Sequence, residues 1–281
     1  MIRTLWQARR LARTLERTMD TSGYSEDTSL LLRALGNARL HFYETSTEFE
    51  LAPYGHIETR SNNPFELAAY HEMLREHVSN LANEVNAFGH RIGQLESWAK
   101  VLPEYCVQDQ LALAIELVNS IALSALQAPY ALRFRAIFAA SHLSHQANMA
   151  VDLAWKESNL PDDKKINFLI MRKCVERWEA SSELIDALTE LSDQSFSDAT
   201  SDFRSRYNHR RPPELVHGIS GLVNRSHDRA SDKTIYAFGA QPPLQLDVLV
   251  SSLADQHSSA LRAFHALSAL IKEQLAAVYA I

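Results

Sequence analysis

The residue spacing between Leu67 and Leu102 constrains the fold more than any other feature of the sequence. Apolar residues, with one histidine, recur there in alternating steps of four and three: Leu67, His71, Leu74, Val78, Leu81, Val85, Phe88, Ile92, Leu95, Ala99 and Leu102. These steps keep the side chains on one face of a helix with a 3.5-residue period. Asn63 as a cap, Pro64 in the first turn and Pro103 as a stop set the expected ends of this helix.

The positions that flank this seam lack the opposed charges that select a coiled-coil partner, so we expect the seam to pack inside its own chain. Helical spacing resumes from Val107 to Ala125, and again from Leu132 to Leu153 after a break expected at Pro129. Another helix is expected from the segment LPDDKK, residues 160 to 165, to about residue 191, and a last one from about 243 to 280.

Short connections between these segments favour antiparallel neighbours. We therefore predict an all-α helical bundle with long antiparallel helices. It would form a single domain over residues 1 to 281, with a long helical hairpin at about 64 to 128.

Three regions depart from this pattern. Residues 1 to 19 are basic and amphipathic, which predicts a first helix with a solvated arginine face or, alternatively, a membrane-surface or transit segment. Residues 39 to 61 have little helical period, and we expect an irregular excursion or a short hairpin there. Residues 192 to 242 contain a predicted short helix from Pro213 to about Arg225 and a polar loop.

Composition narrows the classes of function. The formal charge of −6 argues against coating duplex DNA, although a local basic patch is compatible with it. No uninterrupted apolar run approaches the roughly 18 residues that span a bilayer, so we expect no transmembrane segment. The two cysteines, Cys106 and Cys174, are far apart and have no metal-binding spacing, which is typical of a cytoplasmic protein with reduced thiols.

The chain has no Gly-x-Ser-x-Gly elbow and no glycine-rich phosphate loop, which disfavours acyl transfer and nucleotide hydrolysis. Twelve histidines raise the question of a metal site. A set drawn from Glu66, His71, His77, Glu116, His142 and His145 is conceivable, but a di-iron bundle needs two Glu-x-x-His tetrads and the chain has only Glu214 to His217. We predict no metal and no cofactor, with these histidines hydrogen-bonded or at the surface.

One stretch concentrates basic residues. Residues 203 to 218, FRSRYNHRRPPELVHG, contain four arginines and two histidines with Glu214 as the only acid. Arg211 precedes Pro212, which disfavours helical backbone at Arg211 and predicts a helix that ends near His209. The helix dipole favours an imidazolium there, and a histidine beside arginines suits proton transfer at a ribose 2′-hydroxyl.

This stretch resembles the HEPN superfamily, helical-bundle domains marked by Arg, four to six residues, and then His. The match is Arg204-Ser-Arg-Tyr-Asn-His209, in a region of about residues 104 to 225. The resemblance implies a metal-independent endoribonuclease or RNA-binding protein, often a toxin or defence effector, that acts as a homodimer. It assigns catalysis to Arg204 and His209, with Arg206, Asn208, Arg210 and Arg211 as candidate RNA contacts.

Other pairs meet the same spacing: Arg135 with His142, and Arg210 or Arg211 with His217. Ser205 follows the arginine where the family often has Asn, Asp or His, and on a regular helix positions five apart diverge by about 140°. Two alternatives therefore stand beside the RNA hypothesis. The stretch is a helix end whose arginines pair with acids such as Glu214, or the chain is a non-catalytic adaptor that binds a protein through an exposed helical seam.

Overall fold

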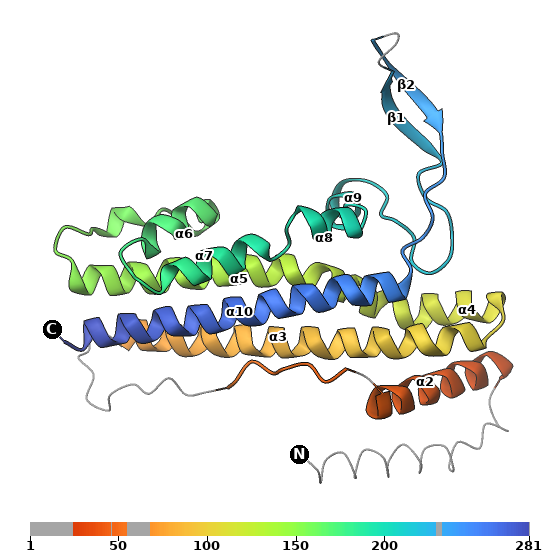
Figure 1. The fold of residues 1–281 in the computed structure, drawn as a ribbon, viewed down its shortest axis with the longest axis horizontal. Coiled ribbons are helices and arrows are strands. Elements are labelled where there is room, and N and C mark those ends of the chain that lie inside the picture. The colour runs from red at the N-terminus through yellow and green to blue at the C-terminus, as the bar shows by residue number, and fades with distance from the viewer. Residues whose placement is uncertain (1–24, 46, 55–67, 229–231, 281) are drawn as a thin grey trace. The chain divides into compact units, whose positions relative to one another are not determined.

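The computed structural model describes residues 25 to 45, 47 to 54, 68 to 228 and 232 to 280, and within them the fold is all-α with one two-stranded hairpin (Figure 1). The predicted N-terminal helix and the expected cap pair Asn63 and Pro64 lie outside the described residues. The longer helices are α2 (Glu26–Thr45), α3 (Ala68–Val101), α5 (Asn119–Val151), α7 (Ser181–Glu190) and α10 (Leu246–Val278).

Shorter elements complete the fold. The α-helices are α4 (Val107–Leu113), α6 (Phe168–Val175), α8 (Gln194–Ala199) and α9 (Phe203–His209). Single turns are η2 (Leu102–Glu104), η3 (Ala114–Val118), η4 (Glu157–Asn159) and η5 (Asp163–Lys165), and the hairpin strands are β1 (Val223–Asp228) and β2 (Lys233–Phe238).

Contacts within the chain divide it into two compact units. Unit 1 comprises Met1–Glu48, His90–Leu126 and Gln194–Leu253, and unit 2 comprises Phe49–Gly89, Gln127–Asp193 and Ala254–Ile281. Helices α3, α5 and α10 contribute residues to both units. Unit 1 contains α2, α4, α8, α9 and the hairpin, and unit 2 contains α6 and α7.

The predicted seam of α3 is buried, as expected for a helix that packs inside its own chain. Its residues Leu74, Val78, Leu81, Val85, Phe88, Ile92 and Leu95 are all buried. The seam residue His71 is buried as well, and its Nε2 is 2.9 Å from the hydroxyl of Tyr279. A strict apolar period therefore identified both the helix and its buried face.

Polar side chains inside unit 2 join three helices. Tyr70 of α3 donates to Gln274 Oε1 of α10 over 3.1 Å, and Gln274 Nε2 donates to Ser144 Oγ of α5 over 2.7 Å. Tyr70, Gln274 and Ser144 are buried, and a buried polar group without a partner would cost about 1–3 kcal/mol. This chain of hydrogen bonds favours one alignment of α3, α5 and α10 in the unit.

The irregular excursion expected over residues 39 to 61 begins later than predicted, because α2 continues to Thr45. Residues 47 to 54 have neither helix nor strand. In this segment Ala52 is held by Asn86 of α3: the Ala52 N–H donates to Asn86 Oδ1 over 2.7 Å, and Asn86 Nδ2 donates to the Ala52 carbonyl over 3.1 Å. A side chain of α3 thus replaces the backbone partners that a regular element would supply.

The break expected at Pro129 is wrong, because α5 continues from Asn119 to Val151 with Pro129 inside it. A proline in a helix interior costs about 3 kcal/mol, since it removes one backbone hydrogen bond and crowds the preceding turn. Leu126 and Leu132 on either side are buried, and each such side chain contributes roughly 1.5–3 kcal/mol. Packing on both sides of the proline is therefore sufficient to offset its cost.

The single helix expected from LPDDKK to about residue 191 is instead the turn η5 followed by two helices, α6 and α7. Between them, Glu273 of α10 accepts hydrogen bonds from the backbone nitrogens of Glu179 and Ala180, each over 2.9 Å. This carboxylate caps the start of α7, where backbone N–H groups lack helical partners. The break between α6 and α7 depends on a residue almost a hundred positions away. The local spacing of apolar residues therefore could not predict it.

The short helix expected from Pro213 to about Arg225 is also wrong. Residues 212 to 222 are extended or turned, and β1 begins at Val223. Two isolated bridges, Leu215 with Leu244 and Ser220 with Gln241, pair this segment with the chain that returns from β2. The double proline therefore begins the stem of a hairpin and not a helix.

Among the described residues, the continuous helical stretch Val107–Val151 is long and apolar enough to cross a membrane by length and composition alone. Its most apolar 18-residue window has a mean hydropathy of 1.6, and 39% of that window is buried. A core helix of a soluble protein meets the same criterion.

Candidate functional site

The basic stretch lies on α9 and on the loop that follows it, in unit 1. Phe203 begins the helix and is buried, and the ring of Tyr207 stacks on it with centroids 5.8 Å apart. The helix ends at His209, and Arg210 has an extended backbone. The helix end predicted from the proline at 212 is thus confirmed, with His209 in the last turn.

Arg204 and His209 are both exposed on this seven-residue helix. Because they lie five positions apart, the regular helix directs them about 140° apart around its axis. Arg206 and His209, three apart, are on one face. Asn208 and Arg210 are also exposed, so all of these side chains except Arg206, which is partly buried, are accessible to a large ligand.

Arg206 holds the helix to its surroundings. Its Nε donates to the carbonyl oxygen of Arg211 over 3.2 Å, and its guanidinium also donates to Oε1 of Gln241. Arg211 pairs with Glu214 over 2.9 Å, with both side chains substantially exposed. The alternative that the arginines neutralise a helix end and pair with Glu214 therefore describes Arg206 and Arg211.

The loop after α9 is anchored at a second point. His217 Nε2 lies 2.8 Å from Oε1 of Gln110 on α4, and Gln110 Nε2 donates to the carbonyl of Tyr105. Backbone hydrogen bonds then form the stem, from Val216 N to Leu244 O over 2.9 Å and between Ser220 and Gln241 in both directions. These contacts attach the base of the hairpin to the helices of unit 1.

The hairpin continues from this stem with β1 and β2 antiparallel, and extends away from α8 and α9 (Figure 1). Val223 pairs with Phe238, Arg225 with Tyr236 and His227 with Thr234, so these six side chains share one face of the ribbon. We call these residues the hairpin face. All six are exposed, with Tyr236 at 72% and Phe238 at 93%.

The α9 stretch and the hairpin form one basic segment of the chain. Residues 203 to 238 contain seven Arg and Lys and three Asp and Glu, a formal charge of +4, whereas the whole chain carries −6. Arg225 is exposed and makes no ion pair with another described residue. On the hairpin face, His227 pairs with Asp232 over 3.1 Å.

Two histidines of the conceivable metal set have other partners, and Glu66 lies outside the described residues. His71 contacts Tyr279, and His145 Nδ1 accepts a hydrogen bond from Trp155. Burial lowers the pKa of both His71 and His145, which favours neutral, hydrogen-bonded rings. In the part of the chain that the structure describes, no three His, Cys, Asp or Glu side chains gather closely enough to hold a metal ion.

Sequence reasoning missed the hairpin. A usable signal was present in the run KTIYAF, residues 233 to 238, which is rich in β-branched and aromatic residues and follows a polar turn. The first strand, VNRSHD, has no such signal, and its pairing with β2 became visible only in the structure.

No protein-family model, no curated protein and no solved structure matches this chain.

Proposed function

We propose that this protein binds single-stranded RNA through the end of α9 and the hairpin face. The observation that carries the proposal is the hairpin face itself. There, Tyr236 and Phe238 are largely exposed, and Arg225 lies directly opposite Tyr236. Exposed aromatic rings beside cations are the usual elements of a surface on which unpaired bases stack.

Exposed cationic side chains in this region support contacts with the phosphates of the RNA backbone. Arg210 and Arg225 are exposed and make no side-chain ion pair with another described residue. Phosphate contacts with such groups attract nucleic acid without reading its sequence. The acidic remainder of the chain disfavours wide coating of a duplex, so binding would be confined to this basic segment.

Base stacking favours the binding of single-stranded RNA over duplexes at this surface. Each base that stacks on an aromatic side chain contributes about 1–3 kcal/mol, and only unpaired bases expose their faces. Two neighbouring rings on one strand, Tyr236 and Phe238, are two positions apart and point to the same side. That spacing, about 7 Å along a strand, suits two successive unstacked bases.

We further propose that the protein cleaves the RNA that it binds. His209 would move a proton to or from a 2′-hydroxyl, and Arg204 would neutralise the charge that develops on the phosphate. Because α9 directs these two side chains apart, a single copy of α9 does not bring them to one phosphate. Cleavage would therefore require a homodimer in which one chain supplies Arg204 and the other His209.

The binding proposal is tested by fluorescence anisotropy with a labelled RNA of mixed sequence, about 16 nucleotides long. In the Tyr236→Ala/Phe238→Ala variant we expect affinity to fall about tenfold or more. Ile235→Ala is the matched control, because Ile235 is an exposed residue of β2 on the opposite face of the ribbon. Equal losses in both variants, or no binding by the wild type, would reject the hairpin face as an RNA site.

The cleavage proposal is tested by incubation with total RNA in the presence of EDTA. Wild-type cleavage that is lost in both His209→Ala and Arg204→Ala supports it, and restored cleavage on mixing the two variants supports the shared dimeric site. Absence of cleavage by the wild type, or unchanged cleavage by His209→Ala, would reject catalysis and leave binding as the function.

One observation favours a second candidate, protein binding. Val107, Leu111 and Ile115 recur every four residues in unit 1 and are exposed at 64%, 48% and 58%. The seam of α3 is buried and is not available to a partner. The exposed stripe of Val107, Leu111 and Ile115 is therefore the surface on which an adaptor would bind a partner helix. Leu111→Lys would abolish co-purification of such a partner and leave RNA binding unchanged.

A further inference from the structure

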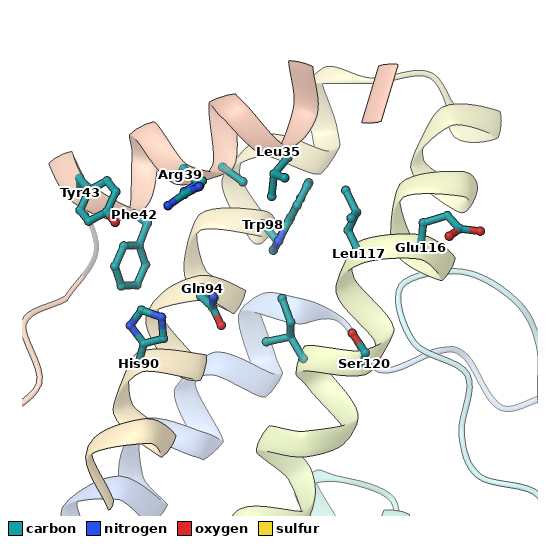
Figure 2. A pocket seen from close by; sticks show the side chains of 12 residues that line it. Leu35, Arg39, Phe42, Tyr43, His90, Gln94, Trp98, Glu116, Leu117 and Ser120 are labelled. Atoms are coloured by element: carbon teal, nitrogen blue, oxygen red, sulfur yellow. The ribbon is translucent and has the colours of Figure 1, made fainter. Parts of the chain in front are cut away.

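A cavity in unit 1 lies among α2, α3 and the beginning of α5, and none of the proposed RNA-binding residues lines it. Its volume is about 410 Å³, and its aromatic walls include Phe42 and Trp98 (Figure 2). Of its polar wall residues, Arg39 and Glu116 are exposed, and Glu116 belongs to the π-helical turn Ala114–Val118. The Glu116 carboxylate points away from the aromatic side chains, so the cavity does not select one class of ligand.

In unit 2, a buried histidine lacks a partner for one of its ring nitrogens. His257 of α10 is 2% exposed and makes a hydrogen bond to the backbone of Val85 on α3. Its Nε2 has no hydrogen-bond partner among the described residues. Nδ1 therefore carries the hydrogen of the neutral ring, and Nε2 presents an unused lone pair inside the unit.

Gly89 of α3 allows this ring to lie unusually close to the helix. A Cβ atom at position 89 would be 2.9 Å from His257 Nε2 and 3.0 Å from the Cβ of Phe49. Both distances are shorter than the roughly 3.5–4.0 Å of an ordinary contact. The ring therefore packs directly on the backbone of α3, with no room for a water molecule between them.

Residues 49 to 54, which we call the strap, pack against His257. The Phe49 ring meets the His257 ring at an interplanar angle of 66°, with centroids 4.9 Å apart. Phe88 of α3 lies against the same ring, with centroids 5.9 Å apart. Two aromatic rings and the backbone at Gly89 thus enclose the imidazole, which favours a neutral ring over a cation without a partner.

Side chains of α3 attach the strap. Asn86 holds Ala52 by two hydrogen bonds, and the Tyr54 hydroxyl donates to Asn83 Oδ1 over 2.9 Å. Leu51 and Tyr54 are exposed at 64% and 61%, so much of the strap faces solvent. A segment with few buried contacts and no regular structure opens at a lower free energy than the helices on which it packs.

One charged group of the strap acts on the His257 ring. Glu50 favours the imidazolium, but its carboxylate is 74% exposed and lies 3.8 Å from Nε2 of His265 on α10. The other titratable groups nearby along α3 and α10 are exposed or ion-paired: Glu84, His90, Asp255 and Arg262. Glu50 is therefore the counter-charge available to a protonated His257, and it remains mostly in solvent.

We propose that protonation of His257 releases the strap from α3 and α10. A proton on Nε2 places an N–H donor and a positive charge where the described residues offer no acceptor. Movement of Phe49 away from the ring admits water to Nε2 and removes this penalty, while the hydrogen bonds of Ala52 and Tyr54 break. Release exposes the surface of Phe88 and His257 that the strap covers at neutral pH.

The direction of the pH dependence follows from the state that binds the proton. Burial holds the pKa of His257 below its ordinary value of 6.5 while the strap is closed, and opening returns the pKa toward 6.5. Between these two values the open state binds more protons, so opening becomes more favourable as the pH falls below 6.5. His265 acts in the opposite sense, because its protonated ring would attract Glu50 and hold the strap.

Hydrogen exchange of the Ala52 amide, followed by NMR, tests the proposal, because this N–H donates to Asn86 while the strap is closed. The protection factor, corrected for the intrinsic exchange rate, should fall by up to about tenfold between pH 7.5 and pH 5.5. In His257→Gln the protection factor should be the same at both pH values. His265→Gln is the matched control on α10 and should retain the fall.

Gly89→Ala is a second variant that does not depend on titration. The added methyl group would collide with His257 and Phe49, so the Ala52 amide should be poorly protected at both pH values. The amide of Leu188, buried in α7 of the same unit, reports unfolding of the whole unit and should remain more protected than Ala52. Circular dichroism verifies that each variant is folded, and His257→Leu replaces His257→Gln if the latter does not fold.

Four results would each overturn the proposal. They are equal wild-type protection of Ala52 at pH 7.5 and pH 5.5, the same fall in the folded His257 variant, full protection of Ala52 in Gly89→Ala, and equal protection of Ala52 and Leu188. The last result would mean that the strap opens only together with the whole unit. None of these results depends on the RNA site, whose residues belong to unit 1.

Discussion

Arg206 and Gln241 are hydrogen-bonded through their side chains, so the helix that carries the basic stretch is tied to the chain that returns from the hairpin. The same guanidinium also donates to the carbonyl of Arg211. One arginine thus joins α9, the loop after it and the stem of the hairpin. Arg206 acts mainly as a structural link, although its sequence context suggested a contact to RNA.

Arg206→Ala is expected to loosen the stem before it affects RNA contacts. Loss of these hydrogen bonds should speed amide exchange of Ser220 and Gln241, whose backbones pair across the stem. The measurement is hydrogen exchange by mass spectrometry, with Arg210→Ala as the control because Arg210 is exposed. If Arg206 instead contacts phosphate, the slope of log affinity for RNA against log salt concentration would become shallower by about 1 in Arg206→Ala. Amide exchange of Ser220 and Gln241 would then stay as in the wild type.

Gln274→Ala is expected to lower the free energy of unfolding by about 3 kcal/mol, because the change leaves the Tyr70 hydroxyl and Ser144 without their partner in a buried site and also creates a cavity. Urea denaturation measures the loss. The control is Gln146→Ala on α5, in the same unit, where the glutamine is partly exposed and its removal should cost far less. Equal losses would show that the hydrogen bonds of Gln274 contribute little.

Stability should fall as the pH is lowered below about 6.5. Burial lowers the pKa of His257 from its ordinary value of 6.5, opposed by a hydrogen bond to the Val85 backbone and by Glu50. Between the lower folded pKa and 6.5 the unfolded chain binds more protons than the native state, so stability rises with pH in that window and is full above it. His71 and His145 have pKa values shifted in the same direction.

Urea unfolding at pH 5.5 and pH 7.5 checks this dependence. His257→Gln removes one titrating group, and the slope of stability against pH should decrease by up to about 1.4 kcal/mol per pH unit. His265→Gln is the control, because His265 is half exposed in the same helix. A slope that is unchanged in His257→Gln would assign the acid sensitivity to other groups.

Deletion of Ile115 is expected to convert the π-helical turn into regular α-helix. Ile115 is 58% exposed, so its removal takes no side chain out of the core, and the helix on each side can keep its register. We expect a folded protein with unchanged or slightly higher stability. The neighbouring Glu116 and Leu117 would leave their places at the cavity that they line.

Thermal unfolding checks the deletion, with deletion of Ala112 in α4 as the comparison, because α4 has no extra residue to lose. If the Ile115 deletion unfolds the protein, the π-helical turn is needed for folding. If the Ile115 deletion is folded and the Ala112 deletion is much less stable, the extra residue of the turn is dispensable for the fold.

The α3 seam and the end of α9 were both predictable because their causes are local. The four-and-three spacing follows from the helical period, and the stop after His209 follows from the restriction that Pro212 places on Arg211. The wrong predictions concern features whose causes lie elsewhere in the chain. Pro129 is tolerated because of its packing, and α6 and α7 are separated where Glu273 of another helix caps the chain.

For the candidate sites, the sequence alone located the basic residues and the Arg204 and His209 pair, because composition needs no coordinates. Only the tertiary structure paired Arg225 with Tyr236 on one face, engaged Arg206 with Gln241, and brought Arg39, Trp98 and Glu116 to one cavity. The physical reason is distance along the chain. Helical period and proline restrictions act over a few residues, whereas these sites are formed by packing between segments that the sequence separates widely.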